Sequence, residues 1–530
     1  MTELSTVVRA PSQVGADAPS DPRVTMDPMS DDLATTSRAR AAQATSPAPT
    51  PPIDEATARR NSVVIWVLIV SAFVVILNET IMGVALPHLM TDLGITAVAA
   101  QWLTTAFLLT MSIVIPVTGF LLQRYRTRPV FLTAMALFTA GTLIAALAPG
   151  FEVLLLARVV QAGGTAIMLP LLMTTVMQLE PPATRGRRMG SISVVIAVAP
   201  AIGPTISGLI LSAFSWRFMF VFVLPIAAAV LALGWRLVRD VSETRDAPID
   251  ALSVVLSALG FGGIVLGLSQ IGEARGGGLP TSTVLSIAVG AVALGLFVWR
   301  QLVLQRIDDA LLDLRTFRAR TFAVSIVMFV VMMMSLFGMI ILLPIFMQEV
   351  LGLSVLQSGL LLLPGGLLMG LCARPVGRAV DRFGPRPLLI PGSALVAATL
   401  WALSAILDPG TPWWALLACH VAMSAGLALM FTPLFAASLG ALPRNLYSHG
   451  SATVSTVQQV AAAAGTALFV STMAAVAAGE VATGAGEAES IATGISAAYL
   501  ISASLATILV VAAFFIERPI DSPEPGHAAH

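Results

Sequence analysis

The chain has 530 residues, of which 57% are hydrophobic and only 11% are charged. Its 29 basic residues are all arginine and are balanced by 29 acidic residues. This composition cannot supply a water-facing surface of ordinary polarity, so it excludes a soluble globular domain and predicts an integral membrane protein. The neutral net charge gives no reason to expect a nucleic-acid partner, and the two cysteines, Cys372 and Cys419, support neither a disulfide framework nor a thiolate metal site.

Residues 1–60 are rich in Ala, Ser, Thr, Pro and Asp and are too polar to bury a core. We therefore expect them to form a disordered cytoplasmic leader. They do not resemble a signal peptide, because the first apolar run follows Arg59 and Arg60 instead of lying near the first residue.

Apolar runs of about 20 residues then recur, each long enough to cross a hydrocarbon core about 30 Å thick. They predict an all-α integral membrane protein with about fourteen transmembrane helices. A barrel is not favoured, because its strands would alternate polar and apolar residues. The predicted spans are 63–86, 100–122, 129–148, 152–178, 190–213, 218–237, 251–271, 282–300, 322–347, 355–376, 387–407, 412–436, 450–477 and 492–515.

Arginines concentrate in every second connection between these spans. The opposite connections hold only Arg217 and Arg275. Under the positive-inside rule the arginine-rich connections face the cytoplasm, which predicts a multi-pass protein of the plasma (inner) membrane with both termini cytoplasmic. The arginine-rich connections contain Arg124, Arg126, Arg128, Arg185, Arg187, Arg188, Arg236, Arg239, Arg245, Arg306, Arg315, Arg318, Arg320, Arg378, Arg382, Arg386 and Arg444.

Two decapeptides in these connections form an internal repeat. "GFLLQRYRTR" begins at Gly119, and "GRAVDRFGPR" begins 258 positions later at Gly377. This offset exceeds a six-helix half by about two helices. We therefore expect an N-terminal six-helix bundle over 61–240, two inserted helices over 241–305, a C-terminal six-helix bundle over 306–518 and a cytoplasmic tail over 519–530. The decapeptides share Gly119 with Gly377, Arg124 with Arg382, and Arg128 with Arg386.

The second decapeptide resembles the cytoplasmic loop signature of the major facilitator superfamily, Gly-x-x-x-Asp-Arg-x-Gly-x-Arg. Its matching residues include Asp381, Arg382 and Gly384. The resemblance implies two six-helix bundles that rock about a central cavity. It also implies that Asp381 and Arg382 latch the cytoplasmic side in the outward-facing state, although a solvated turn that obeys the positive-inside rule explains the arginines too.

Further motifs follow in family order. "LNETIMGVALP" is similar to the first-helix motif of the fourteen-helix drug:proton antiporters, and its Asn-Glu pair resembles the lincomycin-resistance-type members. "RVVQAGGTAIMLP" resembles the fourth-helix motif, and "APAIGPTISG" resembles the fifth-helix motif that marks exporters. The matching residues of these two motifs are Arg158, Gln161, Gly164, Pro170, Gly203, Pro204 and Gly208.

The first decapeptide departs from the family pattern at two positions. Gln123 stands where the family has Asp, and Arg126 stands where it has Gly. Whatever ion pairing that acid provides at the cytoplasmic gate must be absent or relocated in the N-terminal half.

Glu79 is the most informative single residue, because a charge at mid-bilayer costs roughly 2.5 to 3.5 kcal/mol or more. The carboxyl must therefore be protonated, paired or in a water-filled cavity, and each option makes it responsive to protons. The alternative is a carboxyl that only hydrogen-bonds neighbouring helices or lies near the interface. Asn78 could line the same cavity or only hold helices together.

Arg158 cannot shed its charge and needs an acceptor inside the bundle. The resemblance implies that it faces the central cavity and influences protonation of the first-helix acid, here Glu79. The alternative is a structural brace tied to helix carbonyls. In the fifth helix, Gly203 and Pro204 are expected to break the helix locally, and Gly208 to allow close packing, although an ordinary packing kink would also explain the pair.

The sequence leaves two interpretations open for several other candidate residues. Gln458 and Gln459 either contact substrate or bridge helices. Met333 lies in a Met-rich run that either lines a cavity with adaptable side chains or simply packs. His420 and His449 are weaker candidates, because isolated histidines are more often packed than proton carriers.

These features predict a proton-coupled antiporter that exports amphipathic drugs or antibiotics by alternating access. Glu79 and Arg158 would couple protons, whereas the substrate cavity would be lined by Asn78, Gln161, Gln458, Gln459 and Met333. A chain without lysine cannot contain a Walker-type ATP site, so the proton gradient is the expected energy source. We expect no catalysis, metal or other cofactor, and a monomer in the lipid bilayer. The alternatives are a dedicated exporter of one secondary metabolite or a membrane sensor that transports nothing.

Overall fold

The computed structural model describes residues 55–241, 250–273 and 280–517. The chain divides into two compact units, Met1–Ala58 and Arg59–His530. The second unit holds all the helices described below except the first residues of α2. Most of the predicted leader and the predicted tail lie outside the described residues, but Glu55 to Arg60 are helical and begin α2.

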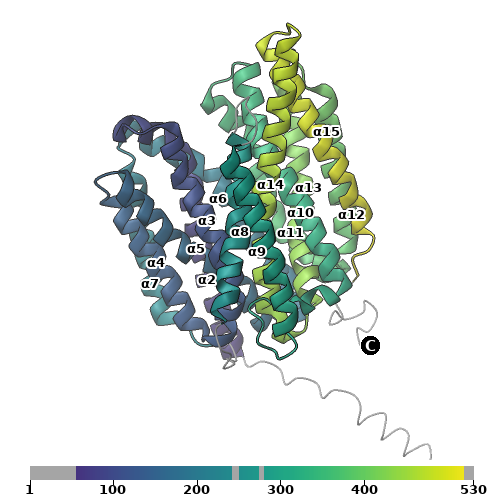
Figure 1. The fold of residues 1–530 in the computed structure, drawn as a ribbon. Coiled ribbons are helices and arrows are strands. Elements are labelled where there is room, and N and C mark those ends of the chain that lie inside the picture. Colours follow the sequence, from purple (N-terminus) through teal and green to yellow (C-terminus); the bar gives the residue numbers. More distant parts are fainter. Residues whose placement is uncertain (1–54, 242–249, 274–279, 518–530) are drawn as a thin grey trace, which may run out of the picture. The chain divides into compact units, whose positions relative to one another are not determined.

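Fourteen long helices make up the described part of the second unit (Figure 1). The first half contains α2 (Glu55–Leu93), α3 (Ala97–Arg124), α4 (Thr127–Ala146), α5 (Phe151–Leu179), α6 (Arg185–Ala213) and α7 (Arg217–Leu237). The insertion contains α8 (Ala251–Glu273) and α9 (Thr281–Leu304). The second half contains α10 (Arg320–Ile345), α11 (Val355–Phe383), α12 (Arg386–Ile406), α13 (Trp413–Gly440), α14 (Tyr447–Ala482) and α15 (Glu487–Ala513).

Four single-turn elements join these helices or extend them. They are η1 (Pro182–Thr184), η2 (Leu314–Arg318), η3 (Phe346–Val350), which is a π-helical turn at the end of α10, and η4 (Arg444–Leu446). Within the described residues, thirteen helices are long and apolar enough to cross a membrane. The other long helix, α6, has 29 residues, so each of the fourteen predicted spans corresponds to one helix.

Local sequence explains where several helices begin and end. Thr96 caps α3 by accepting the N–H of Ala99 at 3.2 Å. Ser354 and Gln357 form a capping box at the start of α11. Gly384 ends α11 with φ 82°, a left-handed conformation that glycine adopts without steric cost. The signature glycine therefore permits the tight turn into α12.

The two halves meet along two seams. One seam joins α6 to α11, and the other joins α3 to α14. The inserted helix α8 packs on its partner α9 and also against both α3 and α14, so the insertion borders the second seam (Figure 1). The connections after α3, α5, α7, α9, α11 and α13 lie at one end of the bundle, which we call the arginine-rich end.

Glycines bring the backbones together at both seams. A Cβ on Gly377 would collide with the backbone of Gly186 in α6, and a Cβ on Gly119 would lie 3.2 Å from Nδ1 of His449 in α14. The first glycines of the two repeated decapeptides thus occupy corresponding places, one in each seam. This correspondence gives the repeat a packing reason.

Candidate functional site

Arg158 lies in the interior of the first half at the head of a short polar chain. Its Nη1 donates to Oε1 of Gln161 at 2.6 Å, and Nε2 of Gln161 donates to the hydroxyl of Thr142 on α4 at 2.8 Å. Arg158 is 1% exposed, and Gln161 and Thr142 are fully buried. The guanidinium also stacks over the ring of Phe107 on α3, 4.0 Å from its centroid. Three helices therefore hold this cation in one orientation.

Close packing of α4 on α5 makes the polar chain possible. A Cβ on Gly141 would lie 2.6 Å from the backbone nitrogen of Gln161, and one on Gly164 would lie 2.7 Å from that of Phe138. Both distances are shorter than a side chain tolerates. Gly141 and the motif residue Gly164 thus set the spacing at which Gln161 can reach Thr142.

Glu79 lies partly buried on α2, within electrostatic range of Arg158. Across the described residues it has no hydrogen bond and no ion pair within 4.0 Å. Its neighbour Asn78 is 3% exposed, and its amide nitrogen lacks a partner there. Nε of Arg158 likewise lacks one. The site therefore holds a carboxyl and a guanidinium near each other without fixing either to a counter-ion.

The fifth-helix motif lies in α6 and packs against Thr80, the residue after Glu79. A Cβ on Gly203 would overlap Oγ1 of Thr80, and this hydroxyl also lies 3.4 Å from the carbonyl oxygen of Ala199. Two of the predictions for this motif are wrong. The helix α6 continues unbroken through Gly203 and Pro204. Gly208 is exposed, and a Cβ there would meet nothing within 4 Å, so it makes no close packing contact.

Asp381 does not pair with Arg382 among the described residues, which contradicts the expected pair. Its carboxylate accepts the backbone N–H of Gly186 at 2.6 Å and that of Arg187 at 2.8 Å, so it caps the first turn of α6 across the seam. The guanidinium of Arg382 stacks over the ring of Phe383 instead. This contact across the seam thus places an acid on a helix N-terminus, where charge and orphan donors both favour it.

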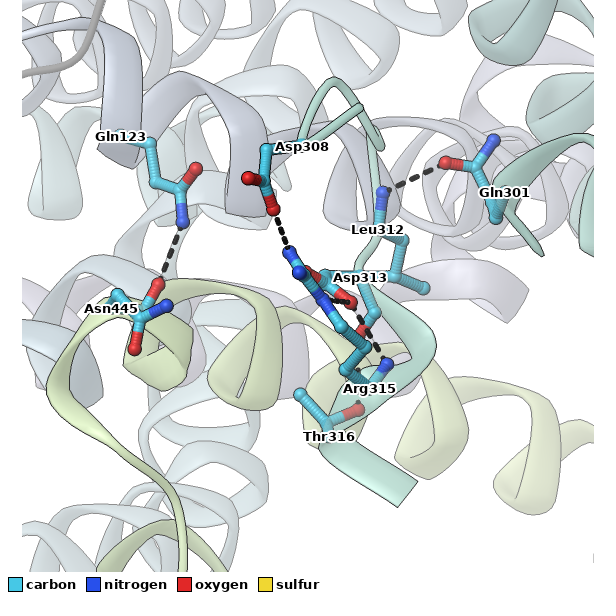
Figure 2. A network of polar contacts seen from close by, with 8 residues as sticks. All are labelled: Gln123, Gln301, Asp308, Leu312, Asp313, Arg315, Thr316 and Asn445. Atoms are coloured by element: carbon cyan, nitrogen blue, oxygen red, sulfur yellow. Dashed lines mark hydrogen bonds and ion pairs between the residues drawn. The ribbon is translucent and has the colours of Figure 1, made fainter. Parts of the chain in front are cut away.

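The corresponding position in the other seam makes one neutral hydrogen bond instead of two to a carboxylate. Nε2 of Gln123 donates to the backbone carbonyl of Asn445 in η4 at 2.9 Å (Figure 2). Arg128 turns away from the seam and donates to the carbonyl of Trp235 at 2.8 Å. Arg126 pairs loosely with Asp240, at 3.8 Å. Arg126 and Arg128 therefore fasten the start of α4 to the end of α7, within the first half.

Direct hydrogen bonds between the halves gather toward the arginine-rich end. Thr174 and Ser451 share one of 2.7 Å, and Thr432 donates to Ser193 at 2.7 Å. Near mid-helix, Nε2 of Gln459 lies 3.7 Å from the sulfur of Met111. The described residues have no such bond between the opposite ends of the two halves. The structure is therefore closed at the arginine-rich end.

A polar pocket of about 680 Å³ lies at the arginine-rich end, where the connection after α9 meets the start of α14. Its lining carries charges of both signs. The lining residues are Leu122, Gln123, Gln178, Val241, Asp308, Ala310, Asp313, Arg315, Arg444, Asn445, Leu446, Ser448 and His449.

The remaining candidates lie in varied surroundings. Gln458 is half-buried on α14, and Met333 is 5% exposed within the main hydrophobic core. One ring nitrogen of His420, Nε2, lies 2.9 Å from the carbonyl oxygen of Leu362. His449 is 3% exposed at the α3–α14 seam. A role for any of these side chains toward substrate or protons stays a prediction.

Sequence reasoning missed Thr142, Phe107 and Thr80. Each acts through a contact between helices. Thr80 lies inside the first-helix motif but is not one of the residues that the motif singles out, and Thr142 and Phe107 belong to no motif. A search for hydroxyl or aromatic residues among the small residues of α4 and α3 could have proposed candidates but not chosen among them. The amide of Gln161 is hydrogen-bonded at both its oxygen and its nitrogen, and its predicted place in the substrate cavity stays a prediction.

The comparisons with known proteins agree with this architecture. The sequence model of the Major Facilitator Superfamily matches residues 68–466. The chain is 39% identical over 457 residues to the lincomycin resistance protein LmrB of Bacillus subtilis, covering 85% of this chain and 95% of that one. It is 29% identical to a multidrug resistance protein B homolog of Mycobacterium tuberculosis, over 74% and 72% of the two chains. Among solved structures, the proton:xylose symporter XylE shares the fold with a TM-score of 0.61 at 15% identity, over 88% of this chain and 98% of that one.

Proposed function

Because the chain belongs to the major facilitator superfamily, we propose that it exports amphipathic drugs or antibiotics across the plasma membrane in exchange for protons. The arginine-rich end would face the cytoplasm under the positive-inside rule. The two halves would alternate between a state open to the outside and one open to the cytoplasm.

The observation that carries this proposal is the placement of Glu79 beside Arg158 without an ion pair. Burial disfavours an isolated charge, a nearby cation favours a carboxylate, and water entering a cavity changes the balance between these effects. A carboxyl in this setting can bind or release a proton as the access of water changes. Arg158, oriented by Gln161 and Thr142, keeps its charge in both states.

The exchange cycle follows from this placement. With the cytoplasmic side closed, Glu79 takes up a proton from outside while substrate leaves. After the halves rock, the carboxyl releases its proton to the cytoplasm and substrate binds. A membrane potential of 100 mV contributes about 2.3 kcal/mol per charge, so one proton can sustain a gradient of roughly fifty-fold before any pH difference is added.

The number of compounds exported distinguishes this proposal from its alternative, a dedicated exporter of one metabolite. One relative is named for resistance to a single antibiotic, lincomycin, and another for multidrug resistance. A drug-susceptibility panel, run with and without expression of the chain, separates a dedicated exporter of one metabolite from a broad one. Protection against several unrelated amphipathic compounds would support broad export.

A direct test uses purified protein in proteoliposomes with a pH-sensitive dye inside. Addition of a compound from the panel should start a proton flux opposite to the compound's movement. Compound movement without any proton flux would contradict antiport, and neither movement nor flux for any protective compound would favour a sensor.

A further inference from the structure

The two seams differ in one charge at the cytoplasmic gate. In the α6–α11 seam, the carboxylate of Asp381 caps the first turn of α6. In the α3–α14 seam, the corresponding residue is the neutral Gln123, which donates to a carbonyl of η4 and leaves the first turn of α14 without an acid from α3. The helix N-terminus carries about half a positive charge, so a site for an anion remains there.

Three charged side chains from the connection after α9 line the same pocket as Gln123 and Asn445 (Figure 2). Arg315 pairs with Asp308 and with Asp313, in each case at 2.5 Å, and its Nε donates to Asp313 at 2.8 Å. The side chain of Asp313 is 4% exposed, whereas that of Asp308 is 48% exposed. The hydrogen bond to Asp313 contributes most to raising the pKa of Arg315 above its usual range, so the arginine stays charged. The three side chains, which we call the triad, carry a net charge of −1.

An apolar cluster holds the residues that precede the triad against the seam. Leu311 and Leu312 are buried in one cluster with Phe120 of α3, Ala452 of α14 and Phe297 of α9. The cluster therefore draws on both halves and on the insertion. The apolar side chains of the connection therefore anchor it at the seam.

The backbone of the connection is anchored to the insertion as well. The N–H of Leu312 donates to Oε1 of Gln301 at 3.2 Å, and the amide of Gln301 donates to Ser253 on α8 at 2.8 Å (Figure 2). The inserted hairpin thus positions the residues that precede the triad.

The triad and the start of α14 line the same pocket. Asp308, Asp313 and Arg315 face it together with Gln123 and His449, and Asp313 lies within electrostatic range of His449. Arg444 lines the pocket too and adds a positive charge that the acids offset. A cytoplasmic opening that separated α3 from α14 would disturb these contacts all at once.

We infer that the Asp308–Arg315–Asp313 triad replaces the acid missing at Gln123 and holds the cytoplasmic end of the α3–α14 seam closed. The three are positioning residues that act through α14, and the insertion is the part of the fold that brings them there. This inference rests on the proposed alternating access. It assigns a role in transport to the insertion, which would otherwise only border the core.

Accessibility of a single cysteine in the pocket tests the inference. The parent carries Cys372→Ala, Cys419→Ala and Ser448→Cys, which leaves one thiol in the pocket lining. Inside-out vesicles are treated with a membrane-impermeant maleimide, and the labelling rate is measured with and without substrate. Asp313→Asn should raise the labelling rate by about two- to fivefold, because loss of a charge at a helix N-terminus shifts the closed state by that factor.

Two further variants separate gating from misfolding. Glu349→Gln removes an exposed acid at the end of α10, outside the pocket lining, and should leave the labelling rate unchanged. Gln123→Asp restores the acid of the family pattern. The double variant Gln123→Asp/Asp313→Asn should label at the parent rate. Gln123→Asp alone should label more slowly than the parent, and this single variant tests the inference even if Asp313→Asn fails to insert.

The possible outcomes test the gating role of the triad separately from the proposed alternating access. If the parent responds to substrate but neither Asp313→Asn nor Gln123→Asp alters labelling, the triad does not hold the gate. If Asp313→Asn speeds labelling and Gln123→Asp does not reverse it, the triad acts only by anchoring the loop, which also overturns the inference. A parent indifferent to both substrate and a pH gradient would overturn the proposed alternating access and the inference with it.

Discussion

In the part of the chain that the structure describes, charged side chains are paired at the arginine-rich ends of the seams but not in the interior of the first half. At the seams, Asp381 accepts two backbone N–H groups, and Arg315 is paired with two aspartates. In the interior, Glu79 has no ion pair among the described residues, and Arg158 donates to a neutral amide. Paired charges suit the proposed closed gate, whereas an unpaired carboxyl suits the proposed proton exchange. Departures from complete pairing are expected at functional sites, and here they coincide with the residues proposed for coupling.

The largest loss of transport is expected when the interior cation is removed. Arg158→Gln leaves the carboxyl of Glu79 without its nearby positive charge, and we expect at least about a hundredfold loss of drug-driven proton flux, equivalent to about 2.7 kcal/mol. Arg158→Lys keeps the charge and should retain part of the flux. Arg217, which binds the carbonyl of Ala148 at the opposite end, offers a matched control as Arg217→Gln. Equal losses in the Arg158→Gln and Arg217→Gln variants would contradict a specific role for Arg158.

A single methyl group tests the contact between α6 and α2. Gly203→Ala places a Cβ where Oγ1 of Thr80 lies, so α2 must shift beside Glu79, and we expect transport to fall about tenfold, equivalent to about 1.4 kcal/mol. Gly208→Ala in the same helix meets nothing within 4 Å and should be silent. The measurement is drug accumulation in proteoliposomes at matched protein content. Similar activity in both variants would show that the contact with Thr80 is unimportant.

The gate should respond more mildly. Asp381→Asn removes the charge that caps α6, which is worth about 1 kcal/mol, and should enlarge the cytoplasm-open population about fivefold. Spin labels on the arginine-rich ends of α6 and α11 would report this shift as a longer distance. Asp240→Asn breaks contacts within the first half only and should leave the distance distribution as it is. The account of the latch is wrong if the two variants give the same distribution.

The last prediction concerns the stability of the insertion and not transport. Hydrogen bonds from Arg300, and then from Ser253, lower the pKa of Asp250 from 3.8 to about 2. Because the folded pKa lies below the unfolded value, the carboxylate stabilises the protein above about pH 4, and this contribution is lost as the pH falls toward 2. Asp250→Asn should cost about 1–2 kcal/mol at neutral pH. Thermal unfolding in detergent should show a difference that shrinks below pH 4, and an equal difference at pH 3 and pH 7 would contradict this reading.

The sequence predicted the helices well because lipid imposes a simple pattern. Long apolar runs indicated all fourteen helices, and the repeat of the two decapeptides paired Gly119 with Gly377, which the structure places one in each seam. Both signals are local. They need no knowledge of which helices touch.

Partners across helices were the part that the sequence could not supply. Asp381 stands next to Arg382 in the chain, yet its carboxylate reaches the backbone of Gly186, 195 residues away. Gly203 and Gly208 look alike in one motif, but only Gly203 meets another helix. Such choices depend on helix rotation, which apolar runs leave undetermined because these helices are apolar on most of their surface.

The central claim is that ionisation of Glu79 couples protons to export. The most direct measurement compares Glu79→Gln with the parent in proteoliposomes, following drug accumulation under an imposed pH gradient. Glu349→Gln, which alters an exposed carboxylate at the end of α10, is the matched control. We expect Glu79→Gln to insert normally and to lose both gradient-driven accumulation and its pH dependence, while Glu349→Gln keeps them. Uphill accumulation with unchanged pH dependence in Glu79→Gln would contradict the claim.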